Sequence, residues 1–237
     1  MRILITGFDP QWGIKKTPSG EVAKLWANGD LQVPGIETHA VVLPQVFGKS
    51  AEMVIAEIQA FDPQAILMFG ATMKNDPLRL ERFAINCEAS VMGDNTRIPV
   101  VPDRSIIQGG PAAYESTLPV YWLMDHLNAI GVDTKVSYHA GTHTCNSLMY
   151  HVLHFLATKP HPMPVIAGFI HVPFPNEFGV VEDSLWTTAT FEGIVQASVG
   201  LVQKVRDWYL DKFGPVPETT PGNISVPSST STKKAIK

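Results

Sequence analysis

The stretch Val136-Ser-Tyr-His-Ala-Gly-Thr-His-Thr-Cys145-Asn-Ser-Leu-Met-Tyr150 joins a strand-like run to a helical run. Small residues follow the strand-like part, and Cys145 then stands where the helical pattern starts. The apolar residues after it recur at the spacing of a helix with one buried stripe, namely Leu148, Met149, Val152, Leu153 and Leu156. The sequence therefore predicts a strand, a short turn, and a helix that begins at the cysteine.

Cys145 is predicted to lie in the first turn of this helix. Free backbone N–H groups and the positive end of the helix dipole favour a thiolate there. The same turn could supply a nucleophile and part of an oxyanion hole. The alternative is a small buried cysteine that happens to precede a helix.

The composition excludes several classes of protein. The chain has 237 residues, of which 45% are hydrophobic and 17% charged, with a formal net charge of −4. This balance and a pI near 6.0 give no basic surface for nucleic acid. Two cysteines do not form a disulfide framework in a chain of this length. No apolar run approaches the roughly 20 residues of a membrane span, and the N-terminus has no signal-peptide layout. We therefore expect a cytoplasmic protein without a nucleic-acid or membrane partner.

Strand-like runs alternate with helical runs through most of the chain. The predicted strands are residues 2–6, 38–43, 65–69, 78–87, 134–138 and 165–172. The predicted helices are residues 21–27, 50–60, 118–130, the run after Cys145, and 189–213, and Thr17-Pro18 is typical of the start of the first helix. Residues 88–110 read as irregular. This alternation predicts a single three-layer α/β/α sandwich around a mainly parallel, twisted sheet.

The sequence also predicts where this domain ends. Residues 1–213 carry the alternating pattern and are expected to form one catalytic domain. Residues 214–237 are rich in Pro, Thr, Ser and Lys and lack periodicity. Such a segment cannot bury enough apolar surface to offset the entropy lost on ordering, so a flexible tail is predicted.

A cysteine nucleophile needs a base, and the base needs a group that orients it. His171 is a candidate base because it lies near the end of an apolar strand, and open α/β sheets bind ligands beyond such ends. Glu81 is a carboxylate on a strand that reads as half-buried. From the residues alone, an exposed Glu81 paired with Arg79 or Arg82 is the favoured interpretation.

Four blocks of sequence now carry a resemblance to a known family. They are Ile5-Thr-Gly-Phe-Asp-Pro10; Leu80-Glu-Arg-Phe-Ala-Ile-Asn86 with Asp94-Asn95; Gly110-Pro-Ala-Ala-Tyr114 with Ser116-Thr-Leu-Pro119; and the turn around Cys145-Asn146 followed by residues 167–173. The chain resembles pyroglutamyl peptidase I, the cysteine peptidases that remove an N-terminal pyroglutamate from peptides. The resemblance runs from about residue 3 to about residue 210.

The resemblance implies a catalytic triad of Glu81, Cys145 and His171. Cys145 would attack the scissile carbonyl, His171 would take and return the proton, and Glu81 would orient the imidazole. It also implies the same α/β/α fold, no cofactor, a peptide substrate with a blocked N-terminus, and a homo-oligomer, either a dimer or a tetramer.

The chain departs from the family pattern around the site. Family members enclose the lactam ring with aromatic rings from the loop after the first strand, and Phe8 matches one of them. Gln11 stands where a second ring is expected, so either Trp12 replaces it or the pocket is wider and more polar. Val91 stands in place of an arginine beside the active centre, which removes a charge and up to five donors. Lys74 and Arg97 are candidates to replace that charge, and Thr72-Met-Lys74 replaces a Gly-Gly-Arg-like segment.

Other functions remain open at this point. A hydrolase with the same triad could act on another cyclic or blocked N-terminal group, or the scaffold could bind without hydrolysis. A nucleoside phosphorylase has a related sheet, but the chain has no phosphate-binding fingerprint. The pairs His139/His143 and His151/His154 suggest a zinc site. No cysteine pair or carboxylate cluster joins them in the sequence, so no metal is expected. Cys87 is expected to be a small core residue.

Overall fold

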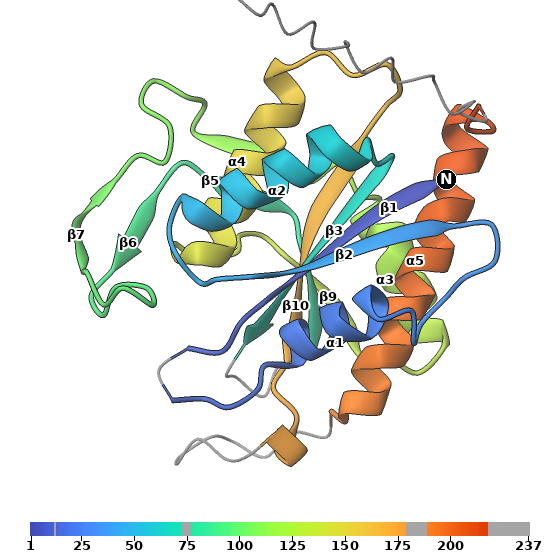
Figure 1. The fold of residues 1–237 in the computed structure, drawn as a ribbon, viewed down its shortest axis with the longest axis horizontal. Coiled ribbons are helices and arrows are strands. Elements are labelled where there is room, and N and C mark those ends of the chain that lie inside the picture. The colour runs from blue at the N-terminus through green and yellow to red at the C-terminus, as the bar shows by residue number, and fades with distance from the viewer. Residues whose placement is uncertain (12, 73–76, 179–188, 218–237) are drawn as a thin grey trace, which may run out of the picture.

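The computed structural model describes residues 1–11, 13–72, 77–178 and 189–217, and its centre is a six-stranded sheet (Figure 1). The strand order is β2-β1-β3-β10-β4-β9. Its strands are β1 (Arg2–Phe8), β2 (Glu37–Leu43), β3 (Ala65–Thr72), β4 (Leu78–Glu81), β9 (Thr134–Ser137) and β10 (Ile166–Pro173). Every neighbouring pair is parallel except β10 and β4, which are antiparallel. The sheet is therefore mixed and mainly parallel, as predicted.

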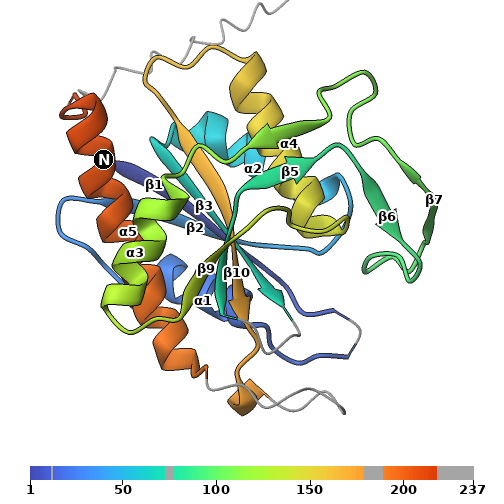
Figure 2. The same cartoon turned by 180° about the vertical axis from the view of Figure 1, so that it is seen from behind.

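Helices cover both faces of the sheet, as the two opposite views show (Figures 1 and 2). One face carries α1 (Pro18–Ala27), α3 (Val120–Ala129) and α5 (Phe191–Phe213), and the other carries α2 (Lys49–Phe61) and α4 (Thr144–Thr158). A 3-10 helix, η1 (Asn176–Phe178), follows β10. The predicted three-layer α/β/α architecture is confirmed. No helix within the described residues is both long and apolar enough to cross a bilayer.

The central strands are buried on both faces because a hydrophobic core lies on each side. All eight residues of β10 are buried, and β3 is buried except at Ala71. Such continuous apolar runs are typical of parallel strands between two helical layers. Alternate residues of each strand enter the two cores, so Ile3 and Ile5 face one core while Leu4 and Phe8 face the other.

The end of β1 is held close to the start of α1. The Thr17 side chain caps the helix by accepting a hydrogen bond from the Gly20 backbone, as its position before Pro18 predicts. Thr17 also donates to the Phe8 carbonyl. A Cβ on Gly20 would lie 2.5 Å from that carbonyl oxygen, so a side chain cannot be accommodated there. This packing fixes the backbone of Phe8 at the carboxyl edge of the sheet.

Two predictions for residues 78–110 are wrong. The strand expected over residues 78–87 ends at Glu81, and β5 (Phe83–Ile85) leaves the main sheet to pair with β8 (Ala113–Glu115). The region expected to be irregular contains a second hairpin of β6 (Glu88–Ser90) and β7 (Val100–Arg104), which projects from the body of the molecule (Figure 1). Sequence periodicity missed both because β5, β6 and β8 are three residues long, and β7 and β8 are mostly exposed.

The remaining boundaries differ from the predictions by small, explicable shifts. Helix α3 begins at Val120 rather than residue 118 because Pro119 occupies the N-cap position. Helix α5 begins at Phe191, where Thr190 caps it by accepting a hydrogen bond from the Gly193 backbone. Of the predicted tail, residues 218–237 lie outside the described residues.

Candidate active site

Cys145 lies in the first turn of α4, as the sequence predicts. His143 is the N-cap, and the first hydrogen bond of the helix runs from the Ser147 backbone N–H to the His143 carbonyl, at 3.0 Å. The N–H groups of the residues between them point out of the helix start and have no partner within the helix. The thiol is half-buried. It is therefore open to a substrate and placed where backbone dipoles stabilise negative charge.

Gly70, near the end of β3, leaves room for the Cys145 sulfur. A Cβ at this position would lie 3.1 Å from Cys145 Sγ and 2.7 Å from the ring of Phe169. Both distances are too short for an undisturbed side chain. The glycine thus allows the sheet and the nucleophile to approach each other closely.

His171 lies on β10 beside Gly70 on β3, and it is 6% exposed. Its Nδ1 is 2.7 Å from Oε1 of Glu81, which comes from the adjacent antiparallel strand β4. Cys145 Sγ lies beside Gly70, the strand partner of His171, close enough to raise the pKa of the imidazole. Since Glu81 engages Nδ1, the nitrogen left to exchange a proton with the sulfur is Nε2. The structure therefore brings together all three residues of the triad expected from the resemblance.

The surroundings of His171 favour its protonated form. Burial alone would lower the pKa of His171, since it disfavours a charged imidazole. Cys145 opposes this effect through its charge and a hydrogen bond, and Glu81 does so through a hydrogen bond and its charge. Together they outweigh burial and raise the pKa of His171 to about 9. This arrangement keeps an imidazolium beside the Cys145 sulfur at neutral pH.

Glu81 is completely buried, so the interpretation of an exposed strand residue is wrong. Arg79 Nε lies 3.7 Å from the same Oε1 atom that meets His171, while Arg82 forms its ion pair with Glu115 instead, at 2.6 Å. Within the described residues, Oε2 of Glu81 has no hydrogen-bond partner. A buried carboxylate is stable only with charged or donor groups close by, and His171 and Arg79 supply them.

Two of the three residues expected to bind substrate lie in the described part of the chain. Phe8 is 2% exposed and its ring is 6.4 Å from that of Phe169, which in turn lies 4.9 Å from the His171 ring. Gln11 is half-buried, and its Nε2 is a buried donor with no partner in the described structure. Trp12 lies outside the described residues.

The position of the missing arginine lies between Ala89 and Gly93, which bond to Thr142 and His143. Val91 is 80% exposed at the end of β6, and Arg97 is exposed in the connection to β7. Lys74, the other candidate to replace the charge, lies outside the described residues.

Asn146, next to the nucleophile, is a structural residue that the sequence analysis did not single out. Its side chain is fully buried and donates to the carbonyls of Ile85 and Cys87, at 2.9 and 3.0 Å, and accepts from the Ile85 N–H at 2.9 Å. These bonds tie the start of α4 to the chain that follows Glu81. In the sequence, the sign of this role was a polar amide at the start of a helix whose following residues are apolar.

Cys87 is not the core residue that was expected. It is half-buried, and its Sγ lies 3.9 Å from Asp103 Oδ2. Burial and the neighbouring Asp103 raise the pKa of the Cys87 thiol. Cys87 therefore carries less thiolate than an unperturbed cysteine, which makes it a poor nucleophile. Among the described residues, no group of three or more His, Cys, Asp or Glu side chains could hold a metal ion.

Comparison with known sequences places this geometry in a family. The family model described as pyroglutamyl peptidase matches residues 1–200. A pyrrolidone-carboxylate peptidase from Pyrococcus furiosus is 36% identical over 180 residues, which cover 75% of this chain and 83% of that protein. One from Bacillus cytotoxicus is 37% identical over 175 residues, covering 74% and 79%.

Solved structures agree with the sequence comparison. A variant of the pyrrolidone carboxyl peptidase from P. furiosus superposes with a TM-score of 0.80 at 30% identity, covering 87% of this chain and 99% of the other. Pyroglutamyl peptidase I from Bacillus amyloliquefaciens gives a TM-score of 0.77 at 30% identity, with 86% and 97% covered. With a cysteine at a helix start, a buried histidine–glutamate pair beside it, and these relatives, the chain belongs to the pyroglutamyl peptidase family of cysteine peptidases.

Proposed function

We propose that this cysteine peptidase hydrolyses the amide bond after an N-terminal pyroglutamyl residue of peptides, with Cys145, His171 and Glu81 as its catalytic triad. The observation that supports the triad most strongly is the contact of His171 with both Glu81 and Cys145 in a buried site. The relatives named above support the pyroglutamyl substrate, and they do not favour a different blocked group, a non-hydrolytic binding protein or a phosphorylase.

In the first step, the Cys145 thiolate adds to the carbonyl carbon of the scissile amide. The developing oxyanion is stabilised by backbone N–H groups at the start of α4, including that of Cys145. The His171 imidazolium then gives its proton to the leaving amine, and the C–N bond breaks. The products of this step are a pyroglutamyl thioester on Cys145 and a peptide with a free N-terminus.

In the second step, the now neutral His171 removes a proton from water, which adds to the thioester carbonyl. The C–S bond breaks, free pyroglutamate leaves, and the thiolate–imidazolium pair is restored. Glu81 accepts the hydrogen bond from His171 Nδ1 throughout, so it fixes the ring and stabilises the imidazolium without itself transferring a proton.

The substrate pocket is proposed to include Phe8, Gln11 and Trp12. The row of rings from Phe8 through Phe169 to His171 provides an apolar wall next to the triad. The unpaired Gln11 Nε2 is a donor that a lactam or peptide carbonyl could satisfy. A pocket with one amide in place of a ring is more polar than an all-aromatic one.

Assays of a pyroglutamyl fluorogenic amide and the matching prolyl amide test this proposal. The prolyl compound has the same ring size but lacks the lactam carbonyl. Hydrolysis of the pyroglutamyl amide with little or no hydrolysis of the prolyl amide is the expected result. No turnover of the pyroglutamyl amide, or equal turnover of both, would refute the proposed specificity.

Three further features are part of the proposal. Residues 1–213 are proposed to be a single catalytic domain and residues 214–237 a tail, since α5 ends at Phe213. Cytoplasmic location is proposed because a reducing compartment keeps Cys145 as a thiol. A homo-oligomer, as a dimer or tetramer, is proposed because four apolar side chains are more than 60% exposed on one hairpin, namely Val91, Met92, Ile98 and Val101. Sedimentation of the purified protein as a monomer would contradict the last of these.

A further inference from the structure

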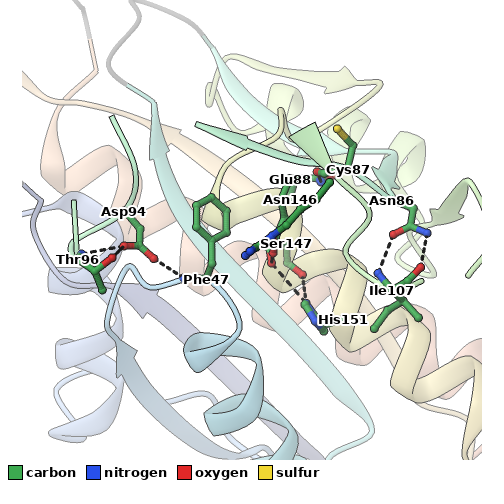
Figure 3. A network of polar contacts seen from close by, with 11 residues as sticks. Phe47, Asn86, Cys87, Glu88, Asp94, Thr96, Ile107, Asn146, Ser147 and His151 are labelled. Atoms are coloured by element: carbon green, nitrogen blue, oxygen red, sulfur yellow. Dashed lines mark hydrogen bonds and ion pairs between the residues drawn. The ribbon is translucent and has the colours of Figure 1, made fainter. Parts of the chain in front are cut away.

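A buried carboxylate lies in the connection between β6 and β7, away from the triad. Asp94 is 4% exposed, and its Oδ2 accepts a hydrogen bond from the Phe47 backbone at 2.7 Å. Its Oδ1 accepts from the Thr96 backbone at 2.8 Å and from the Thr96 hydroxyl at 2.6 Å (Figure 3). A carboxylate is buried in this way only where such bonds hold it, so Asp94 anchors the connection to the loop before α2.

The residue after this anchor reaches the loop that carries the proposed pocket. The Asn95 backbone N–H donates to the Gln45 carbonyl at 3.0 Å, and Asn95 Nδ2 donates to the Pro10 carbonyl at 3.3 Å. Gln45 Nε2 in turn donates to the Asp9 carbonyl at 2.9 Å. The backbone immediately before Gln11 is therefore tied to the connection through both Asn95 and Gln45.

The residue before the anchor reaches the helix that carries the nucleophile. His143 Nε2 lies 2.9 Å from the Gly93 carbonyl oxygen, and its Nδ1 lies 3.1 Å from the Thr144 hydroxyl. The ring of His143 also meets the ring of Phe47 edge-on, with centroids 5.2 Å apart. Residues 93–95 thus contact the N-cap of α4, two residues before Cys145, as well as the loop at Pro10.

We infer that Asp94 and Asn95 are positioning residues that set the spacing between the substrate loop at residues 8–11 and the Cys145 turn. This inference rests on the proposed function. Asp94 holds the connection in place, Asn95 ties it to the substrate loop, and the Gly93 carbonyl ties it to His143. Neither residue contacts the triad in any of these bonds, so both act through the walls of the pocket.

The Cys145 turn and the substrate loop differ in the other contacts that hold them in place. The Cys145 side is also fixed by the packing of α4 and by the three bonds of Asn146. On the loop side, Thr17 holds the Phe8 carbonyl and the Asp9 N–H donates to the Leu43 carbonyl. Asp9 is exposed, however, and Gln45 and Asn95 hold the Asp9 and Pro10 carbonyls. Loss of the anchor should therefore displace the substrate loop more than the nucleophile. Binding of the pyroglutamyl ring should weaken while the reactivity of Cys145 is kept.

The test uses Asp94→Asn and Asn95→Ala in the full-length protein. Asp94→Asn keeps the shape of the side chain but replaces a carboxylate oxygen, which accepts from the Phe47 or Thr96 N–H, with an NH2 donor. Asn95→Ala removes the bond to the Pro10 carbonyl, and Asn95 is exposed. Asp103→Asn is the matched control, because Asp103 is an exposed acid on the same hairpin and its contact is with Cys87, not with the substrate loop or His143. Three quantities are measured: KM and kcat for a pyroglutamyl fluorogenic amide, the rate of Cys145 alkylation by iodoacetamide, and Tm.

We expect both test variants to raise KM about five- to thirtyfold, the range for one lost charge-assisted or neutral hydrogen bond. The alkylation rate should stay within about twofold of wild type, and Asp103→Asn should keep the wild-type KM. A wild-type KM in both test variants overturns the inference. So does a parallel fall of kcat, alkylation rate and Tm at constant KM, which would mean a purely structural role. Wild-type protein that does not cleave the amide refutes the proposed function itself, and the inference with it.

Discussion

At the scale of single residues, His171 lies between two groups that both favour its charged form. Glu81 Oε1 meets Nδ1, and Cys145 is hydrogen-bonded to the same ring. The imidazolium therefore persists at neutral pH, and the leaving amine meets a protonated acid.

The pH dependence of turnover follows from this arrangement. Since the pKa of His171 is raised to about 9, the imidazolium persists through neutral pH and is lost as the pH rises through that value. We expect kcat/KM for a pyroglutamyl amide to fall above pH of about 9. Glu81→Gln removes one of the negative charges that raise the pKa, so its alkaline limb should move to lower pH.

Glu115→Gln is the control for this comparison, because Glu115 pairs with Arg82 at the surface and not with the triad. Its pH profile should match that of wild type. An alkaline limb that is the same in Glu81→Gln as in wild type would contradict the role given to Glu81.

Gln11 tests the chemistry of the pocket. A second aromatic ring against the lactam is worth about 0.5–1.5 kcal/mol beyond its buried area. Gln11→Phe should therefore raise kcat/KM for the pyroglutamyl amide about two- to twelvefold, if Gln11 faces the ring as the resemblance implies. If Trp12 already replaces that ring, Gln11→Phe will change nothing and Trp12→Ala will be the damaging substitution. No effect from either variant would show that this loop does not set specificity.

At the scale of elements, the approach of β3 to α4 depends on Gly70. A Cβ there would come within 2.7 Å of the Phe169 ring and 3.1 Å of Cys145 Sγ, so Gly70→Ala should move both. We expect a loss of about 1–3 kcal/mol in unfolding free energy from overpacking, and at least a tenfold drop in kcat. Urea unfolding and steady-state kinetics measure the two effects.

Gly200→Ala on α5 is the matched control for Gly70→Ala. A Cβ at Gly200 would be 3.4 Å from its nearest neighbour, and alanine favours a helix by about 1 kcal/mol over glycine. This variant should be neutral or slightly more stable with unchanged kcat. Equal effects at the two glycines would show that the space beside Cys145 is not special.

The long central elements could be predicted from the sequence because their periodicity is local. The strands at residues 65–69 and 165–172 and the helix after Cys145 are continuous patterns, and the structure has all three. The break after Glu81 could not be predicted in this way. It depends on Asn146, some 60 residues later, which binds the backbone of Ile85. The β6–β7 hairpin depends likewise on Arg104 pairing with Glu88.

The site, like the fold, has features that local sequence predicts and features that it does not. The position of Cys145 at a helix start and the candidacy of His171 near a strand end followed from the local pattern, whereas the role of Glu81 rested on the family resemblance. Their contact joins residues 90 positions apart, and no local pattern specifies it. Asp94 and Asn146 stand in the blocks that carry the resemblance, but their structural roles could not be predicted, since their partners lie far along the chain.

At the scale of the whole molecule, the described part of the chain ends with α5 and the few residues after it. Val216 still packs against the core that α5 covers. We expect a protein truncated after residue 217 to keep its Tm within about 2 °C and its kcat/KM within about twofold. Truncation after residue 208 removes the last part of α5, including the fully buried Tyr209, and should lower Tm sharply. A large loss of activity on removal of residues 218–237 would contradict a single domain ending at residue 213.

The central claim is that Cys145 is the nucleophile for pyroglutamyl hydrolysis, and alkylation coupled to activity tests it most directly. The wild-type protein and Cys87→Ser are treated with iodoacetamide, residual turnover of a pyroglutamyl amide is followed, and the alkylated peptide is identified by mass spectrometry. We predict that activity falls in proportion to modification of Cys145, that Cys87→Ser behaves like wild type, and that Cys145→Ala is folded and inactive. Turnover that survives full modification of Cys145, or that persists in Cys145→Ala, would contradict the account.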